Sequence, residues 1–249
     1  MKTNFLPRCG TPQQEIDSNI AHTKTLGLNA PQDQLRPKLA VVGGGHSILN
    51  HIETLQKWEG DIWACGSAFP WCVKNSIDAI YFCIDGSPIV ELARGAKKAI
   101  LASTTHPSVF EVLKDAEVEV FDLFHTEETS NHGTTSFTSA PHLAISIGYK
   151  DVTFFGADSS FEGNSHAYGH YDKPLQMVVR VGEERFTTDP ELFMQAELLA
   201  TMIRLVPHVF KEESGGLLGA MVKDLDYDLI SVSEALLALR VTDECPVPG

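Results

Sequence analysis

Short apolar runs alternate with segments of helical pattern from Lys38 to Phe155, and this alternation restricts the possible folds more than any other feature. The runs have the composition of buried strands and lie at residues 38–42, 61–65, 79–84, 98–102, 118–123 and 151–155. The helical segments between them lie at residues 48–57, 69–75, 88–93, 108–114 and 136–147. Strands separated by helices of this length pair in parallel through right-handed crossovers. The sequence therefore predicts an α/β fold with a doubly wound, mostly parallel Rossmann-like sheet and helices on both faces.

The segments outside this alternation predict smaller elements. Residues 1–37 are rich in Gln, Asn and Pro and form an N-terminal arm with one helix near residues 15–25. The rest, residues 38–249, is expected to be a single Rossmann-like domain with a hairpin insertion at 176–188. Asp189 and Pro190 then begin a helix that runs to about Leu205. The tail is expected to contain a strand at 208–211, a Gly215-Gly216 turn and a helix at 233–239.

The charge balance excludes several function classes. The chain has 19 Lys and Arg against 33 Asp and Glu, a formal charge of -14, so a broad surface for nucleic acid or anionic lipid is not expected. An anionic small ligand can still bind through backbone amides. No apolar run is long enough to span a membrane, and the N-terminus lacks the apolar core of a signal peptide, which predicts a cytoplasmic protein. The five cysteines include no C-x-x-C pair, so neither a disulfide framework nor a cysteine zinc site is indicated.

In an open α/β sheet, ligands bind beyond the carboxyl ends of the strands, so the residues that follow each strand are informative. The first strand is followed by Gly43-Gly44-Gly45-His46-Ser47. Glycines there let backbone amides approach an anion at a helix N-terminus, although a tight turn that needs glycine for its geometry is the alternative. No Lys follows the glycines, which excludes a P-loop of the G-x-x-x-x-G-K-[ST] type. Ile48 replaces the third glycine of a dinucleotide-binding fingerprint. Gly66-Ser67 ends the second strand without an acid for a ribose, so an NAD-dependent dehydrogenase is disfavoured.

Polar side chains follow two further strands. Asp85 follows the third strand, where it could bind a ribose hydroxyl, a metal or an amine, or simply cap a helix. After the fifth strand, Thr135 and Ser136 precede a helix and offer hydroxyls and amides to a phosphate or a ribose. Ordinary capping explains one of these hydroxyls but not the whole polar cluster at residues 131–136.

The densest polar stretch follows the sixth strand. It begins with Gly156 and Asp158 and continues through a loop that contains His166 and His170. A histidine near neutral pKa is the usual general base for an acceptor hydroxyl. The two histidines could instead bind a metal, but the sequence has no H-E-x-x-H helix. Catalysis is therefore the favoured interpretation of this loop.

Several of these motifs resemble a superfamily of nucleotide-dependent transferases. It includes the motility-associated factor glycosyltransferases, bacterial lipooligosaccharide sialyltransferases and the domain named for archaeal 6-hydroxymethylpterin diphosphokinase. Residues 41–48 resemble the first-strand turn of these proteins, with His46 in place of a proline, and residues 65–68 and 84–85 look like the next two strand ends of the motility-associated branch. Residues 135–158 and 165–170 are similar to the sialyltransferases. Gly133 stands where those enzymes have an acceptor-binding arginine, so transfer of sialic acid to a glycan is not implied.

The resemblance implies roles for individual residues. His170 matches the proposed general base, and we group His166 and Asp158 with it as catalytic residues. The expected nucleotide-binding residues are Gly43, Gly44, Gly45, Ser47, Gly66, Ser67, Asp85, Thr135, Ser136 and Gly156. Asp85 and Asp158 would hold Mg²⁺ if the reaction depends on it.

The expected function is nucleotide-dependent group transfer by a Rossmann-like transferase domain. The favoured reaction is glycosyl transfer from a CMP-sugar or UDP-sugar to a hydroxyl acceptor. One alternative is diphosphoryl transfer from ATP with Mg²⁺, as in 6-hydroxymethylpterin diphosphokinase, and another is a non-catalytic nucleotide-binding module. The expected partners are a small-molecule nucleotide and a hydroxyl acceptor, with no nucleic acid and no membrane span. The sequence determines neither a further cofactor nor the oligomeric state.

Overall fold

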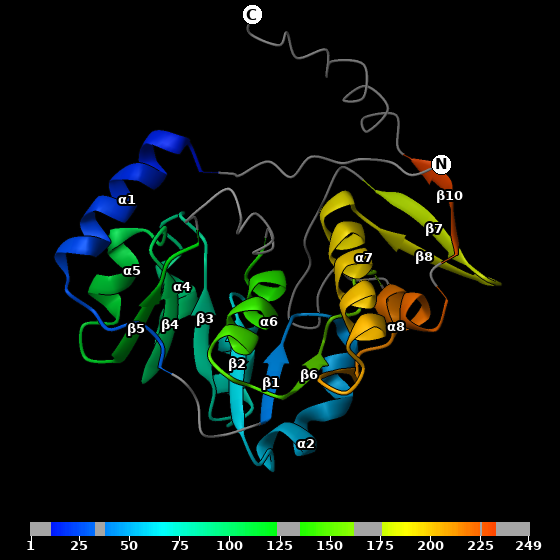
Figure 1. Cartoon of the computed structure of the whole chain (residues 1–249), viewed down its shortest axis with the longest axis horizontal. Coiled ribbons are helices and arrows are strands. Elements are labelled where there is room, and N and C mark those ends of the chain that lie inside the picture. The colour runs from blue at the N-terminus through cyan, green and yellow to red at the C-terminus, as the bar shows by residue number, and fades with distance from the viewer. Residues whose placement is uncertain (1–10, 33–37, 124–134, 162–175, 225, 233–249) are drawn as a thin grey trace, which may run out of the picture.

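A computed structural model describes residues 11–32, 38–123, 135–161, 176–224 and 226–232 (Figure 1). Its main element is a seven-stranded sheet in the order β5-β4-β3-β2-β1-β6-β9, and every strand pairs in parallel with its neighbours. The strands are β1 (Lys38–Val42), β2 (Asp61–Cys65), β3 (Ile80–Cys83), β4 (Lys98–Ala102), β5 (Glu117–Phe121), β6 (Asp151–Phe155) and β9 (Phe210–Glu212). The predicted doubly wound fold is confirmed, with strand bounds within two residues of those expected.

Helices cover both faces of the sheet because the strands are apolar on both sides. Residues of β1 alternate between two buried clusters: Leu39 and Val41 join one, and Ala40 and Val42 join the other. The first cluster packs against α6 (Ser136–Ser146), α7 (Pro190–Leu205) and α8 (Gly216–Lys223). The second packs against helices of the first half of the chain: η1 (His46–His51), α2 (Ile52–Gln56), α3 (Ala68–Lys74), α4 (Val90–Ala93) and α5 (Pro107–Val112). The single helix expected at 48–57 is thus a 3-10 turn followed by a short α-helix.

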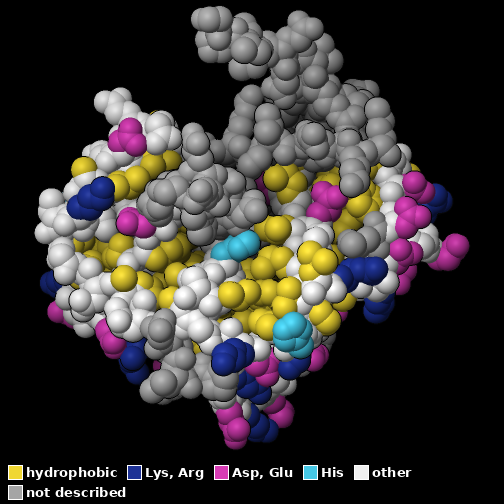
Figure 2. Space-filling model, in the orientation of Figure 1, with side chains coloured by type: hydrophobic (Ala, Val, Ile, Leu, Met, Phe, Trp, Pro, Cys, Tyr) yellow, Lys and Arg dark blue, Asp and Glu magenta, His cyan; other side chains and the backbone are white. Residues whose placement is uncertain are grey.

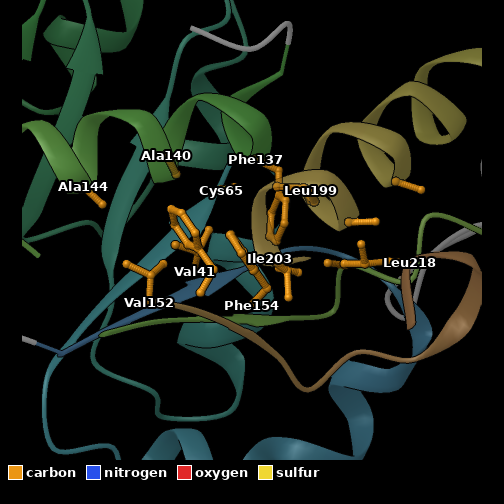
Figure 3. Close-up of a cluster of buried hydrophobic side chains, with 14 of the residues drawn as sticks. Val41, Cys65, Phe137, Ala140, Ala144, Val152, Phe154, Leu199, Ile203 and Leu218 are labelled. Atoms are coloured by element: carbon orange, nitrogen blue, oxygen red, sulfur yellow. The ribbon is translucent and has the colours of Figure 1, made fainter. Parts of the chain in front are cut away.

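The core between the sheet and α6 holds the N-terminus of that helix in place. Figure 3 shows Phe137, Ala140 and Ala144 of α6 directed toward strand residues that include Val41 and Phe154. Phe137 lies at the carboxyl end of the sheet, where a Cβ atom added to Gly43 would lie 2.8 Å from its ring. The packing therefore brings the start of α6 to the glycine turn after β1.

The second half of the chain differs from expectation in two places. The predicted hairpin is present as β7 (Met177–Val181) and β8 (Glu184–Thr188), but β10 (Tyr227–Val232) also pairs with β7 and completes a three-stranded antiparallel sheet. The Gly215-Gly216 turn leads directly into α8, which the sequence analysis missed. The helix expected at 233–239 lies outside the described residues.

The surface and the helix lengths agree with the composition. On the face seen in Figure 2, the Lys and Arg side chains are scattered among Asp and Glu and form no broad basic surface. Within the described ranges, no helix has the length and apolar character needed to cross a bilayer, and the longest, α7, has 16 residues.

Candidate functional site

The strand order reverses at β1, which has β2 on one side and β6 on the other. At this position the chain segments that follow β1 and β6 remain in contact. Gly43 N donates to Phe155 O at 2.8 Å and Gly45 N donates to Gly156 O at 2.7 Å. The approach is so close that a Cβ atom on Gly43 would lie 2.6 Å from Gly156 O. The glycines are therefore needed for this contact, whatever else the turn binds.

Asp158 holds the start of η1. Ser47 N donates to Asp158 Oδ2 at 2.7 Å, and Ser47 Oγ donates to Asp158 Oδ1. The Asp158 side chain is buried. Its carboxylate thus takes the place at the first turn of η1 where the sequence analysis expected a phosphate. This geometry gives Asp158 a structural role, and its assignment as a catalytic or Mg²⁺-binding residue remains a prediction.

The amide of Gly44 is placed differently from its neighbours. Alternate amides of an extended chain point to opposite sides, so the amides of Gly43 and Gly45 face β6 and that of Gly44 faces away from it. Gly44 N has no hydrogen-bond acceptor within the described part of the chain. On that side β2 ends at Gly66, whose φ is +51° and where an added Cβ atom would meet nothing within 4 Å. An unpaired amide therefore lies on the side of the turn where open space adjoins the end of β2.

The start of α6 uses both of its predicted hydroxyls structurally. Thr135 Oγ1 accepts from Thr138 N at 3.1 Å, and Thr138 Oγ1 accepts from Thr135 N at 3.0 Å, which forms a capping box. Ser136 Oγ accepts from Ile84 N at 3.2 Å. Ser136 thus ties α6 to the end of β3 and lies at the same edge of the sheet as Gly66 and Ser67.

The two carboxylates predicted as metal ligands are not brought together. Asp85 is exposed, and its Oδ1 accepts from Ser87 N at 2.8 Å. It follows β3, three positions from β6 in the sheet, which corresponds to about 14 Å at the usual strand spacing. Among the described residues, no group of three or more His, Cys, Asp or Glu side chains could hold a metal ion.

The turn after β6 is fixed by residues that the sequence analysis did not identify. Ser159 has a φ of +54°. Its carbonyl accepts from Thr188 Oγ1 at 2.7 Å, and its hydroxyl accepts from Gln195 Nε2 at 3.1 Å. A Cβ atom on Gly216 would lie 2.6 Å from Asp158 O. Residues of β8, α7 and α8 therefore contact the turn and hold it in place. Only the glycine pair at 215–216 carried a local signal of this contact.

His46 also belongs to this site. Its Nδ1 is buried and has no hydrogen-bond partner in the described ranges. Leaving a buried polar atom unpaired is costly, so this imidazole is a candidate for contact with a ligand. His166 and His170 lie outside the described residues, and their roles remain predictions.

The thiols of Cys65 and Cys83, at the ends of β2 and β3, are packing residues. Both side chains are buried, and burial raises the pKa of each thiol. Burial also raises the pKa of Cys72 to about 12. Protonated thiols are poor nucleophiles, so burial disfavours nucleophilic chemistry at these three cysteines.

Comparison with known proteins adds a fold relationship. No model of a protein family matches the chain, and no curated protein matches it. Among solved structures, it is similar to the MAf glycosyltransferase from Magnetospirillum magneticum AMB-1, with a TM-score of 0.59 and 18% sequence identity. The two proteins share a fold. The match covers 88% of this chain and 42% of that protein, so this chain corresponds to less than half of its length.

Proposed function

We propose that this chain is a nucleotide-dependent glycosyltransferase that binds the phosphates of a nucleotide-sugar at the glycine turn after β1. The observation that carries the proposal is the Gly44 amide, which has no acceptor among the described residues and faces away from β6 on the side of the open space at Gly66. Backbone amides bind phosphate without basic side chains, which suits a chain of net charge -14. A topological switch point is also where doubly wound folds bind nucleotides.

The reaction requires a base for the acceptor. An acceptor hydroxyl attacks the anomeric carbon, the bond from that carbon to the phosphate oxygen breaks, and the nucleotide leaves with the electron pair. The hydroxyl proton passes to His170, which we propose as the general base. His166 is proposed to assist it from the same loop. Likeness to a protein described as a glycosyltransferase favours this reaction over other transfers.

The first test is a thermal-shift panel of CMP, UDP, GDP and ATP, each with and without Mg²⁺. A ligand at 100 times its Kd stabilises the native state by about 2.7 kcal/mol. We expect CMP or UDP to raise the Tm without metal. A shift confined to ATP with Mg²⁺ would instead indicate diphosphoryl transfer, and no shift with any nucleotide would contradict the proposed site.

A pair of substitutions tests the location of the site. Gly66→Asn tolerates the left-handed backbone and places a side chain in the open space, so it should abolish the nucleotide-induced shift. Gly95→Asn is the matched control because Gly95 has a φ of +82° and an equally open Cβ position but precedes β4. It therefore lies at the opposite edge of the sheet. Equal nucleotide shifts in both variants would contradict the proposed location.

The general base is tested by His170→Ala, with exposed His208→Ala as control. Loss of a general base lowers turnover by about 10² to 10⁴, while nucleotide affinity should change little. Unchanged turnover in His170→Ala would refute the assignment of the base.

A further inference from the structure

Helix α1 (Gln13–Thr25) covers the carboxyl ends of β3 and β4, on the same edge of the sheet as the proposed nucleotide site (Figure 1). Asn19 is the centre of this contact and is 2% exposed. Its Nδ2 donates to Gly86 O at 3.1 Å and to Thr104 O at 3.0 Å. Gly86 follows β3 and Thr104 follows β4. One carboxamide of the arm thus occupies two carbonyl acceptors at the edge where ligands bind in this class of fold.

The contact leaves polar groups unsatisfied. Thr23, Ser103 and Thr105 are 5%, 2% and 0% exposed, and the hydroxyl of each is buried without a hydrogen-bond partner within the described ranges. Buried hydroxyls are normally paired, and an unpaired one is costly. Thr23 belongs to α1 itself, whereas Ser103 and Thr105 flank Thr104 in the turn after β4. This turn therefore offers two hydroxyls that have no partner in α1 or elsewhere in the described residues.

The helix is held by few apolar contacts. Ile16 is the one apolar side chain that α1 buries, and its N-cap, Pro12, provides no side-chain hydrogen bond. A separate helix of 13 residues is marginally stable in water, so α1 depends on this docking. The following segment is anchored separately, since Asn29 O accepts from Val120 N of β5 at 2.9 Å. Helix α1 can therefore leave the edge while the segment at Asn29 stays bound to β5.

We propose that α1 is a detachable cover, and that the sugar of the nucleotide-sugar donor takes the place of the Asn19 carboxamide when α1 leaves. This inference rests on the proposed function. In the sheet, β3 lies two positions from β1, about 10 Å at the usual strand spacing. A donor whose phosphate lies at Gly44 can span this distance with the group beyond the phosphate. The carbonyls of Gly86 and Thr104 and the hydroxyls of Ser103 and Thr105 stay behind when α1 leaves. They are uncharged and include both donors and acceptors, which suits a sugar.

A reversible lock tests whether α1 must leave. The hydroxyl oxygens of Thr11 and Ser87 are 3.4 Å apart, so Thr11→Cys with Ser87→Cys can fix α1 by a disulfide. Cys9→Ser and Cys245→Ser remove the two cysteines outside the described residues.

Calorimetry then measures the binding of each ligand to the locked and reduced protein, and compares CMP with CMP-N-acetylneuraminate and UDP with UDP-N-acetylglucosamine. We expect the oxidised disulfide to weaken binding of the nucleotide-sugar and to leave binding of the nucleotide unchanged. Reduction of the disulfide should restore the affinity for the nucleotide-sugar. Unchanged nucleotide-sugar affinity overturns the proposal. An equal loss of affinity for the nucleotide alone overturns the assignment of this subsite to the sugar.

Release of the cover gives a quantitative second test. Asn19→Ala removes both hydrogen bonds, while Gln13→Ala on the same helix removes only an exposed contact with Asp17 and serves as control. Hydrogen exchange of the α1 amides in the unchanged chain gives the undocked fraction. Asn19→Ala should raise nucleotide-sugar affinity by up to the inverse of that fraction, and an unchanged or lower affinity overturns the proposal.

Hydrogen exchange also separates this inference from the proposed function. If no nucleotide or nucleotide-sugar binds any variant, the proposed function fails. Hydrogen exchange of the α1 amides in the Asn19→Ala variant still decides whether α1 detaches. Loss of protection confined to α1 supports a detachable cover, whereas unchanged protection, or loss that extends through β3 and β4, overturns it.

Discussion

The pair formed by Ser47 and Asp158 gives the sharpest test of how the glycine turn is built. The Asp158 carboxylate accepts hydrogen bonds from both the amide and the hydroxyl of Ser47. Ser47→Ala removes only the hydroxyl bond, whereas Asp158→Ala removes both. The double variant loses the same two bonds as Asp158→Ala alone, so the effects of the single substitutions should not add.

The size of this coupling follows from the charge on the acceptor. A hydrogen bond to a charged group contributes about 1.5–3 kcal/mol, so Ser47→Ala should lower the free energy of unfolding by that amount. Asp158→Ala should lower it by about 3–6 kcal/mol through the two bonds together. The coupling energy between the two positions should therefore be about 1.5–3 kcal/mol. For a domain of this size, each kcal/mol corresponds to about 2–4 °C in Tm.

Urea unfolding of the parent, both single variants and the double variant measures this coupling. The m-values should agree among the four proteins, which shows that the denatured states are comparable. A coupling energy below about 0.5 kcal/mol, the usual limit for independent sites, would refute the inference that this carboxylate fixes the turn.

Three further predictions follow from other contacts. Gly45→Ala places a Cβ atom 2.7 Å from Asp158 Cγ, and overpacking of this kind should cost about 1–3 kcal/mol in urea unfolding; full stability would show that the turn can open. Burial raises the pKa of Cys72 from 9.0 to about 12, so its contribution to stability is complete below pH 9 and is lost as the pH rises to about 12. Pulsed unfolding should show a loss of about 1.4 kcal/mol per pH unit in that window, and Cys72→Ala should lack this part of the slope. Asp189 caps α7 by accepting from Leu192 N at 2.9 Å, so Asp189→Ala should cost about 1 kcal/mol, and an unchanged Tm would contradict this role.

The sequence predicted the region of the candidate site, but it did not predict most of the contacts within that region. Gly43, Gly66, Ser136 and Asp158 do lie at the carboxyl edge of the sheet, because their positions follow from the order of strands. Their partners do not follow from it. Nothing near Asp158 in the sequence indicates that its carboxylate binds Ser47, which precedes it by 111 positions.

Missed elements have a similar explanation. The apolar runs of β1 to β4 and β6 are buried on both faces and can be recognised alone. By contrast, β10 is an edge strand whose pairing with β7 depends on where α7 and α8 place the chain. The start of α8 was interpreted as a turn, because Gly215 and Gly216 both have positive φ and commonly mark loops.

The sequence by itself determined the parallel sheet, the layers around it and the edge at which a ligand would bind. Strand and helix periodicity and the handedness of crossovers are local properties, so they can be inferred from short windows of residues. Only the tertiary structure decided that the Gly43 and Gly45 amides pair with β6 while that of Gly44 does not, that Asp158 caps η1, and that Asn19 covers the ends of β3 and β4. These contacts join segments far apart in the chain, and their geometry is set by packing of the whole domain.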